Sequence, residues 1–381
     1  MLKSKLTFPV IIAGLLLVAP FKDAEAQKLP SKSKIVSDMA LTNEYFMKKW
    51  PDPGAVTNVG RIRTSNLWTR AVYYEGLMAL YKIDKQQKYY KYAMDWSTHH
   101  KWETRDGLNT RNADNQCCSQ TYIELYQIDK KPEYIEPTKK NIDLMLASDK
   151  VDDWHWIDAL QMAMPIFAKL GAIYKDDRYY EKMYDIYNYS KTKHGGNGLY
   201  NPAEKLWWRD KDFVPPYKEP NGANCYWSRG NGWVVAAMVR VLEVMPKNAP
   251  HRQEYVTMLK DMIEALVPLQ RADGYWNVSL ADPTNFGGKE LSGTALFTYG
   301  MAWGVKNGIF NKKKYLPIIT KAWNAMSKDC IHPDGMLGFV QGTGKEPKDG
   351  QPVNYDHVPD FEDYGLGCFL LAGSEVYGLS K

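Results

Sequence analysis

Twelve segments in which apolar residues recur at three- and four-residue steps run through most of this 381-residue chain. That spacing places the apolar side chains on one face of a helix, whereas the alternation typical of strands is scarce. The sequence therefore predicts an all-α fold with helices at 33–49, 66–82, 87–100, 115–129, 133–147, 154–170, 177–191, 231–245, 252–269, 292–307, 312–330 and 363–379.

A repeated tyrosine marks alternate segments. Those segments are rich in Lys and Glu, so we expect them to form an outer layer around the more apolar segments. Six outer helices alternating with six inner ones predict an (α/α)6 barrel. One such barrel can use the whole chain, so we expect a single domain over residues 27–381. The tyrosines are Tyr89, Tyr90, Tyr134, Tyr179, Tyr180, Tyr255 and Tyr315.

Long loops lead from the outer segments into the inner ones, and four of them carry the same kind of turn. The turns are Asp106-Gly107, Asn197-Gly198, Asp273-Gly274 and Asp334-Gly335. Glycine adopts positive φ at low cost, so these pairs favour tight turns. All inner helices should then begin at one end of the barrel. Their N–H groups and dipoles would favour an anionic ligand there.

Asp158 is the first candidate site residue. It lies in the apolar stretch 154–164, which predicts a buried helix capped by Asp152 or Asp153. In that helix Asp158 would lie past the first turn, so capping does not explain it. A carboxylate among apolar side chains is costly to bury unless it is paired, hydrogen-bonded or protonated. We interpret it as functional, and the alternative is a hydrogen bond to a neighbouring loop.

Two more candidates lie where inner helices are predicted to start. Asp114 opens the second inner helix, and its alternative role is simple capping of that helix. Arg229 lies within 226–233, between tryptophans and beside glycines that let the backbone approach a ligand. A structural ion pair is the alternative role for Arg229.

The first 26 residues are predicted to be a secretory signal. They contain a basic start, an apolar run from 6 to 20 and the small-residue cleavage site 24–26. The run is too short to span a bilayer, and no cysteine follows it closely as a site for a lipid anchor. We therefore expect a periplasmic or secreted protein without a membrane anchor.

The composition indicates neither a metal site nor a nucleic-acid module. The five cysteines are odd in number and include no C-x-x-C, so we expect buried free thiols. The seven histidines show no metal-ligand spacing, and the net charge of +5 is spread through the chain. We expect no cofactor and see no sign of an obligate protein partner. Thirteen Trp and 26 Tyr suit a sugar site, although barrel cores also use them.

Three motifs resemble glycoside hydrolase family 105, the unsaturated rhamnogalacturonyl and glucuronyl hydrolases. They are Trp156-Ile157-Asp158, the stretch 227–233 and the stretch 364–375, and the likeness runs from about Asn66 to Leu379. The family fold is an (α/α)6 barrel. The resemblance implies that Asp158 is the general acid/base and Asp114 the second essential carboxylate. It places substrate contacts at Tyr74, Trp156, Trp227, Arg229, Trp233 and Gln341.

Arg209 departs from the pectin-type pattern, in which a His follows the paired aromatic residues. The loop 215–220 differs as well. The chain therefore resembles the branch that acts on unsaturated glucuronic acid linked to rhamnose, as in ulvan oligosaccharides. A pectin-type rhamnogalacturonyl hydrolase is the alternative. We expect Arg209 to bind a substrate carboxylate or sulfate, the alternative being a surface salt bridge with Asp210 or Asp212.

The family reaction hydrates the C4=C5 vinyl ether that a polysaccharide lyase leaves in the terminal uronic acid. Asp158 would protonate C4 and then activate the water that attacks C5, with no metal or cofactor. Its apolar surroundings should raise its pKa and keep it protonated. Two other classes stay open: a lyase or epimerase on the same barrel, which typically needs a Tyr or His base, and a non-catalytic glycan-binding protein.

Overall fold

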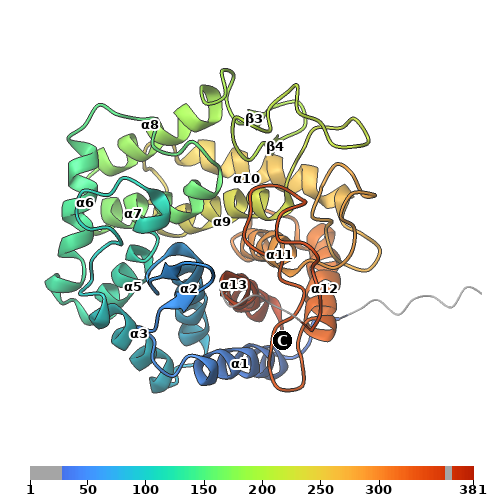
Figure 1. Ribbon diagram of the computed structural model, residues 1–381, viewed down its shortest axis with the longest axis horizontal. Coiled ribbons are helices and arrows are strands. Elements are labelled where there is room, and N and C mark those ends of the chain that lie inside the picture. The colour runs from blue at the N-terminus through green and yellow to red at the C-terminus, as the bar shows by residue number, and fades with distance from the viewer. Residues whose placement is uncertain (1–27, 357–362) are drawn as a thin grey trace, which may run out of the picture.

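The computed structural model describes residues 28–356 and 363–381, and the predicted signal segment lies outside them. Two concentric layers of helices make up the fold (Figure 1). The inner layer comprises α2 (Trp68–Ile83), α4 (Ala113–Gln116) followed by α5 (Ser119–Asp129), α7 (Asp158–Tyr174), α9 (Ser228–Val244), α11 (Leu291–Lys306) and α13 (Tyr364–Leu379). The outer layer comprises α1 (Lys32–Lys49), α3 (Gln87–His99), α6 (Glu136–Leu146), α8 (Arg178–Thr192), α10 (Arg252–Leu266) and α12 (Lys312–Asp329).

The inner helices close into a ring. Each one packs against the next along the chain, from α2 through α5, α7, α9 and α11 to α13, and α13 packs back against α2. Outer helices cover this ring, since α3 lies on α2, α8 on α7, α10 on α9 and α12 on α11. The all-α, (α/α)6-barrel prediction is confirmed. Apart from short 3-10 turns, helices alternate between the layers because each inner helix must bury side chains on both its axial and its outer face.

The tyrosines that open the outer helices explain the repeat in the sequence. Tyr89, Tyr134, Tyr179, Tyr255 and Tyr315 are all buried, with exposures between 0 and 5%. A tyrosine near the start of an outer helix fills the space between the two layers with a large, largely apolar ring. The same packing problem recurs at α3, α6, α8, α10 and α12, and a tyrosine fills the space at each of them.

The predicted Asp-Gly and Asn-Gly turns are confirmed by their backbone angles. Gly107, Gly198, Gly274 and Gly335 all have positive φ, between 79° and 98°. At Gly198 a Cβ atom would come within 2.0 Å of the carbonyl oxygen of Lys191, so only glycine fits there. These turns connect outer helices to the loops that precede the inner ones.

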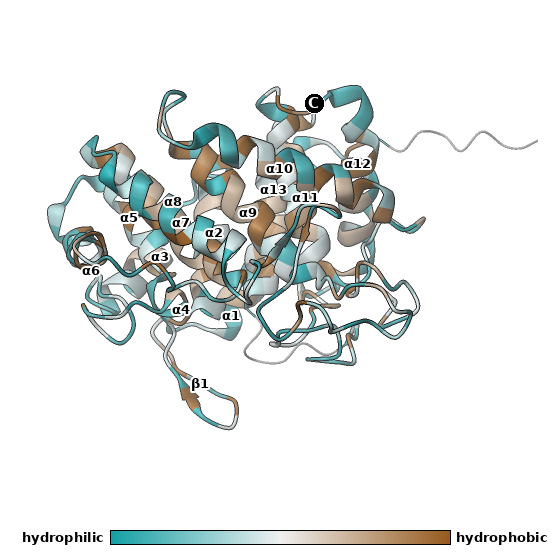
Figure 2. Ribbon diagram, turned by 90° about the horizontal axis from the view of Figure 1, so that it is seen from above, coloured by the Kyte–Doolittle hydropathy of each residue, from teal (hydrophilic) through white to brown (hydrophobic). Residues whose placement is uncertain are grey.

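Two short hairpins of the described residues lie in the long loops that precede inner helices. β1 (Thr57–Asn58) pairs antiparallel with β2 (Ile62–Arg63), and the hairpin projects from the body on the side where α4 lies (Figure 2). β3 (Tyr200–Asn201) pairs antiparallel with β4 (Leu206–Trp207), with Tyr200 opposite Trp207.

The predicted start of the third inner helix is wrong. The sequence placed it at residue 154 with Asp152 or Asp153 as its cap, but α7 begins at Asp158. Residues 151–155 are irregular, and the side chain of Asp153 accepts a hydrogen bond from Arg111 Nε at 2.7 Å instead. Asp158 therefore lies in the first turn of the helix, not beyond it. Smaller shifts occur at α9, which begins at Ser228 rather than 231, and at 115–129, which is divided into α4 and α5.

The five cysteines are free and buried, as the sequence predicts. Across residues 28–356 and 363–381, no three His, Cys, Asp or Glu side chains gather as possible ligands of a metal ion. None of the helices in these ranges combines the length and the apolar composition needed to cross a bilayer.

Candidate active site

The first turns of the inner helices meet at one end of the barrel, as predicted. Asp114 of α4 lies close enough to Asp158 of α7 for that carboxylate to raise its pKa, and Arg229 of α9 lowers the pKa of Asp158. The guanidinium of Arg229 in turn lies over the ring of Tyr364, the first residue of α13, at 4.8 Å. The structure thus brings together the two carboxylates and an arginine that lie far apart in the chain.

A main-chain pairing sets the position of Asp158. Trp156 forms an antiparallel bridge with Asp210, and the N–H of Ile157 donates to the carbonyl oxygen of Arg209 at 2.9 Å. This extended pairing delays the helix until residue 158, because a backbone bonded to a neighbouring strand cannot begin a helix at the same residues. It also places Arg209 beside the Asp158 carboxylate, which is 7% exposed.

Arg209 pairs with two carboxylates. Its Nε lies 3.2 Å from Asp158 Oδ2, and its Nη1 lies 2.6 Å from Asp210 Oδ2. The alternative role, a salt bridge with Asp210, is present, but it does not lie on the surface. Both carboxylates are buried, and the Arg209 side chain is 20% exposed. The guanidinium contacts the Asp158 carboxylate directly and lies at the edge of the site. Contact with a substrate stays a prediction.

Burial raises the pKa of both carboxyl groups, and the negative charge of Asp158 adds to the shift at Asp114. Burial raises the pKa of Asp158, while Arg209 and Arg229 oppose that shift. Burial, followed by the negative charge of Asp158, raises the pKa of Asp114 to about 7, and Arg209 and Arg105 oppose it. Two carboxyl groups that interact in this way share their protons as a pair. Both shifts favour the protonated form of the pair, which general acid catalysis requires.

Asp114 is not the residue that caps its helix. Asn112 precedes α4, and its side-chain oxygen accepts a hydrogen bond from the Asp114 N–H at 2.9 Å. The alternative role of simple N-capping is therefore wrong for Asp114 and belongs to Asn112. The Asp114 carboxyl group is left to interact with Asp158.

Arg229 anchors the loop that follows residue 340. It is fully buried, and it donates to the main-chain oxygens of Gln341 at 2.9 Å and Gly342 at 2.8 Å. These bonds go to carbonyl oxygens rather than to a carboxylate, so the alternative of a structural ion pair is wrong. The Gln341 side chain is also fully buried: its oxygen accepts from Trp227 Nε1 at 3.0 Å, and its nitrogen donates to the carbonyl of Asp349 at 2.6 Å.

Asn231 explains part of the 227–233 motif. Its side-chain oxygen accepts from the Trp207 N–H at 2.9 Å, and its side-chain nitrogen donates to the Trp207 carbonyl at 3.0 Å. These reciprocal bonds hold β4 against the start of α9. Since Arg209 lies two residues beyond Trp207, Asn231 indirectly positions Arg209 and, through the bridge at 156, Asp158.

Three of the predicted aromatic contacts, Trp156, Trp227 and Trp233, lie in or next to the segments where the inner helices begin. Trp233 lies near the helix starts, with its ring edge-on to Trp68 at 6.2 Å, and Trp68 stacks on Tyr364 at 5.0 Å. Trp156 and Trp227 flank the same region in sequence and are 6% and 1% exposed.

Tyr74 points elsewhere. It stacks on Trp96 of the outer helix α3 at 3.9 Å and is fully buried between the two layers. The structure does not bring its ring to the pair of carboxylates.

Sequence reasoning missed Trp68 and gave no individual role to Tyr364. Trp68 is the first residue of α2, as Asp158 is of α7 and Tyr364 of α13. Once the starts of the inner helices are known, a residue's position at such a start indicates that it lies near the site. Trp68 is only partly buried, so its ring offers an apolar face at this end of the barrel.

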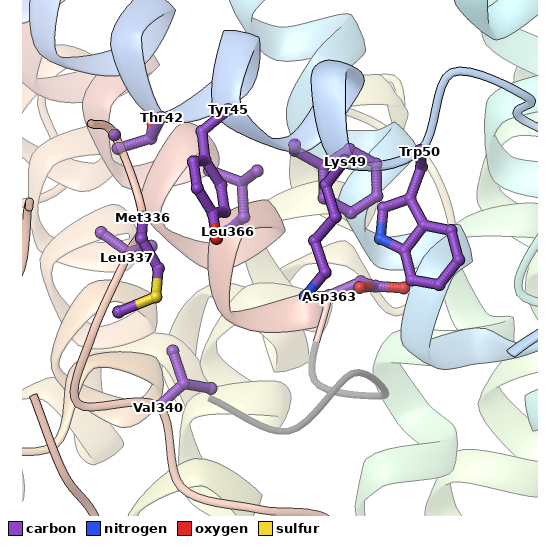
Figure 3. Close-up of a pocket in the computed structure, with 11 residues that line it drawn as sticks. Thr42, Tyr45, Lys49, Trp50, Met336, Leu337, Val340, Asp363 and Leu366 are labelled. Atoms are coloured by element: carbon purple, nitrogen blue, oxygen red, sulfur yellow. The ribbon is translucent and has the colours of Figure 1, made fainter. Parts of the chain in front are cut away.

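A separate pocket lies between α1, the segment 335–340 and the start of α13 (Figure 3). Its volume is about 70 Å³, and the side chains of Tyr45, Lys49, Trp50 and Asp363 line it. None of the predicted site residues lines this pocket. The chemistry described above therefore belongs to the helix starts and not to this pocket.

Comparison with known proteins agrees with the fold. The family model described as Glycosyl Hydrolase Family 88 matches residues 39–380. The chain is 35% identical over 334 residues to the unsaturated 3S-rhamnoglycuronyl hydrolase of Formosa agariphila, covering 82% of this chain and 85% of that protein.

Among solved structures, a family 88 glycosyl hydrolase from Bacteroides vulgatus superposes with a TM-score of 0.82 at 30% identity, covering 91% of this chain and 99% of that one. A structure named as a polysaccharide lyase superposes with a TM-score of 0.81, also at 30% identity, covering 91% and 97%.

The motifs pointed to family 105, while the matching model carries the family 88 name. Solved structures named for either family share this fold. The family model covers nearly all of the described chain, including both carboxylates and the motif around Arg229. The chain belongs to glycosyl hydrolase family 88, and the protein is a glycosidase.

Proposed function

We propose that this glycosidase removes the terminal 4,5-unsaturated uronic acid from oligosaccharides that polysaccharide lyases release. One observation carries the proposal: Asp114 and Asp158 are two interacting carboxyl groups with raised pKa at the starts of inner helices, next to Arg209. A site whose carboxyl groups favour the protonated form beside a cation suits a substrate that carries a carboxylate and must be protonated on carbon.

The proposed chemistry follows from the vinyl ether. Asp158 gives its proton to C4, which leaves positive charge shared by C5 and the ring oxygen. The Asp158 carboxylate then takes a proton from the water that bonds to C5, so the acid is regenerated. The resulting hemiketal opens and releases the neighbouring sugar. Because the anomeric bond is not attacked, the usual spacing rule for pairs of glycosidase carboxylates does not apply.

For the substrate branch, we propose an unsaturated glucuronyl residue linked to rhamnose, as in ulvan fragments. The similarity to a Formosa protein named unsaturated 3S-rhamnoglycuronyl hydrolase supports this choice, as does Arg209 in place of the pectin-type His. Pectin-derived rhamnogalacturonyl fragments are the alternative. We further propose that residues 1–26 direct export, which would put the enzyme in the periplasm or outside the cell.

Ultraviolet absorbance tests the reaction and separates it from the second candidate, a lyase, which the similarity to a structure of that name favours. A lyase creates the conjugated C=C–carboxylate group and raises absorbance on intact polysaccharide. The proposed hydrolase destroys this group and lowers absorbance on the unsaturated disaccharide. A saturated disaccharide of the same linkage should stay intact. Equal cleavage of saturated and unsaturated substrates would contradict hydration of the double bond.

Asp158→Asn tests the assignment of the acid. The amide keeps the shape of the side chain but cannot donate a proton to carbon, so kcat should fall by about 10²- to 10⁴-fold. Steady-state kinetics on the unsaturated disaccharide measure this. A glycan-binding protein without activity would instead bind the oligosaccharide and show no absorbance change with the wild-type chain.

A further inference from the structure

Glu75 is a fully buried carboxylate in the interior of the barrel. It belongs to α2, whereas the acid pair described above lies on α4 and α7. Its burial raises its pKa to about 7, against the opposing charges of Arg240 and Lys169. Burying a carboxylate costs free energy, and Glu75 has no role in the proposed hydration reaction. Its contacts therefore indicate what it does.

Glu75 contacts the two acid-bearing segments one helical turn below each acid. Cys117 Sγ donates to Glu75 Oε1 at 3.4 Å, and Gln161 Nε2 donates to Glu75 Oε2 at 2.8 Å. Cys117 follows Asp114 by three residues, and Gln161 follows Asp158 by three. Residues three apart on a helix share a face, so Glu75 lies beneath both acids, roughly 5 Å deeper along the helices.

Arg240 contacts Glu75 from the other side and joins it to a buried charged network. Arg240 Nε of α9 lies 3.3 Å from Glu75 Oε2, and Arg240 also pairs with Glu124 of α5 at 2.8 Å. Glu124 pairs in turn with Lys169 of α7 at 2.6 Å. These side chains are at most 5% exposed. Glu75 therefore cannot move independently of the four inner helices it connects.

We infer that Glu75 is a positioning residue for the two-acid site, tying the segments that carry Asp114 and Asp158 to each other and to α2. The inference rests on the proposed function insofar as those two carboxyl groups carry the reaction. Glu75 does not reach a substrate, because it is fully buried below both acids. Its effect should therefore appear in kcat, which depends on the geometry of the reacting groups, and not in KM.

Glu75→Leu is the first test, because leucine has a similar size and no acceptor for Cys117 or Gln161. Displacing the acids should lower kcat between about ten- and a hundred-fold on the unsaturated disaccharide. KM should stay within about two-fold of wild type. Glu75→Gln should recover most of kcat, because the amide oxygen can accept from Gln161 Nε2 and Arg240 Nε as Glu75 Oε2 does, while the amide nitrogen faces Cys117 Sγ.

Glu124→Leu is the matched control. It removes an equally buried carboxylate of the same network, with the same partner Arg240, but it touches neither Cys117 nor Gln161. It should lower the melting temperature while leaving kcat within about two-fold of wild type. If Glu75→Leu and Glu124→Leu lower kcat alike, or if neither lowers it, Glu75 does not position the acids.

Two further measurements make the result decisive. If Glu75→Leu does not fold, Gln161→Met removes only the tie to α7 and should still lower kcat at unchanged KM; unchanged kcat overturns the inference. Hydrogen exchange should quicken in segments 110–118 and 156–163 in Glu75→Leu but not in Glu124→Leu. This comparison needs no substrate. If the wild-type chain is inactive on unsaturated disaccharides, the proposed function fails, and exchange alone supports or refutes the tie.

Discussion

Asp114 couples its ionisation to the stability of the fold. Its pKa is raised from 3.8 to about 7, so the folded protein binds this proton more tightly than the unfolded chain does. The stabilisation is complete below about pH 3.8 and is lost as the pH rises towards 7. At higher pH the ionised, half-buried carboxylate is repelled by the negative charge of Asp158, which costs free energy.

We predict that Asp114→Asn lowers kcat but raises the melting temperature at pH 8 relative to wild type. The asparagine stays neutral, so it avoids the buried charge that the wild-type side chain carries at that pH. The gain should shrink at pH 5, where the wild-type group is protonated. Thermal unfolding of both proteins at the two pH values measures this. A gain of equal size at pH 5 and pH 8 would show that ionisation of Asp114 is not the cause.

Arg209 controls the acid that it touches. Because it lowers the pKa of Asp158, Arg209→Ala should raise that pKa. Activity that requires protonated Asp158 should then persist to higher pH, so the alkaline limb of kcat moves upward. If Arg209 also binds the substrate, as we propose, loss of that charge-assisted contact should reduce kcat/KM by roughly ten- to a hundred-fold.

The pH dependence of kcat and KM for Arg209→Ala, on sulfated and unsulfated disaccharides, separates these two effects. Lys211→Ala is the control, since Lys211 is an exposed cation two residues away. An unchanged alkaline limb would mean that Arg209 does not set the ionisation of Asp158. A small, equal change on both substrates would mean that Arg209 does not bind the substrate.

At the scale of elements, Arg229 joins α9 to the loop that begins at residue 341. Its guanidinium satisfies two main-chain carbonyl groups and packs over the Trp227 ring at 4.4 Å. A helix residue thereby fixes a loop more than a hundred positions later in the chain. The motif 227–233 therefore binds both β4, through Asn231, and this loop, through Arg229.

We predict that Arg229→Met loosens this loop. Methionine fills part of the space but donates to neither carbonyl, which costs about 1.5–3 kcal/mol per charged hydrogen bond. Limited proteolysis and hydrogen exchange should increase within 341–351, and KM should rise if the loop lines the substrate. Arg178→Met, which removes an exposed arginine, is the control. Unchanged protection of 341–351 would show that Arg229 does not anchor the loop.

At the scale of the whole molecule, the interior of the barrel is held by charges as well as by apolar packing. Glu124 pairs with Lys169 and Arg240, so removing it alone leaves two buried cations without their shared partner. Breaking a buried pair in this way typically costs about 3–5 kcal/mol. Burial lowers the pKa of Lys169 to about 8, so loss of its proton can relieve part of that cost.

We therefore predict that Glu124→Leu destabilises the fold more than the double variant Glu124→Leu/Lys169→Met. The double variant replaces the pair by apolar side chains and leaves Arg240 with Glu75. Denaturant unfolding at pH 7 measures both free energies. A double variant that is less stable than the single one would show that the charged pair itself contributes net stability.

The sequence by itself determined the architecture, because the information is local and repeated. Apolar periodicity identified the helices, the recurring tyrosine separated the two layers, and glycine turns marked their connections. Asp158 could be singled out because a carboxylate within an apolar helix is costly to bury, and Asp114 because it lies where an inner helix was predicted to start. The motif around Arg229 was visible because the arginine lies between tryptophans and beside glycines, although its partners were not.

Only the tertiary structure decided what each of these residues touches. The bridge from 156 to 210 moved the start of α7 to Asp158 and put Arg209 against it, since long-range backbone pairing outweighs local helix propensity. Asn112 took the capping role expected of Asp114, and Tyr74 turned to the outer layer. Glu75 gained its importance from partners 42 and 86 residues away, a separation that no local pattern records.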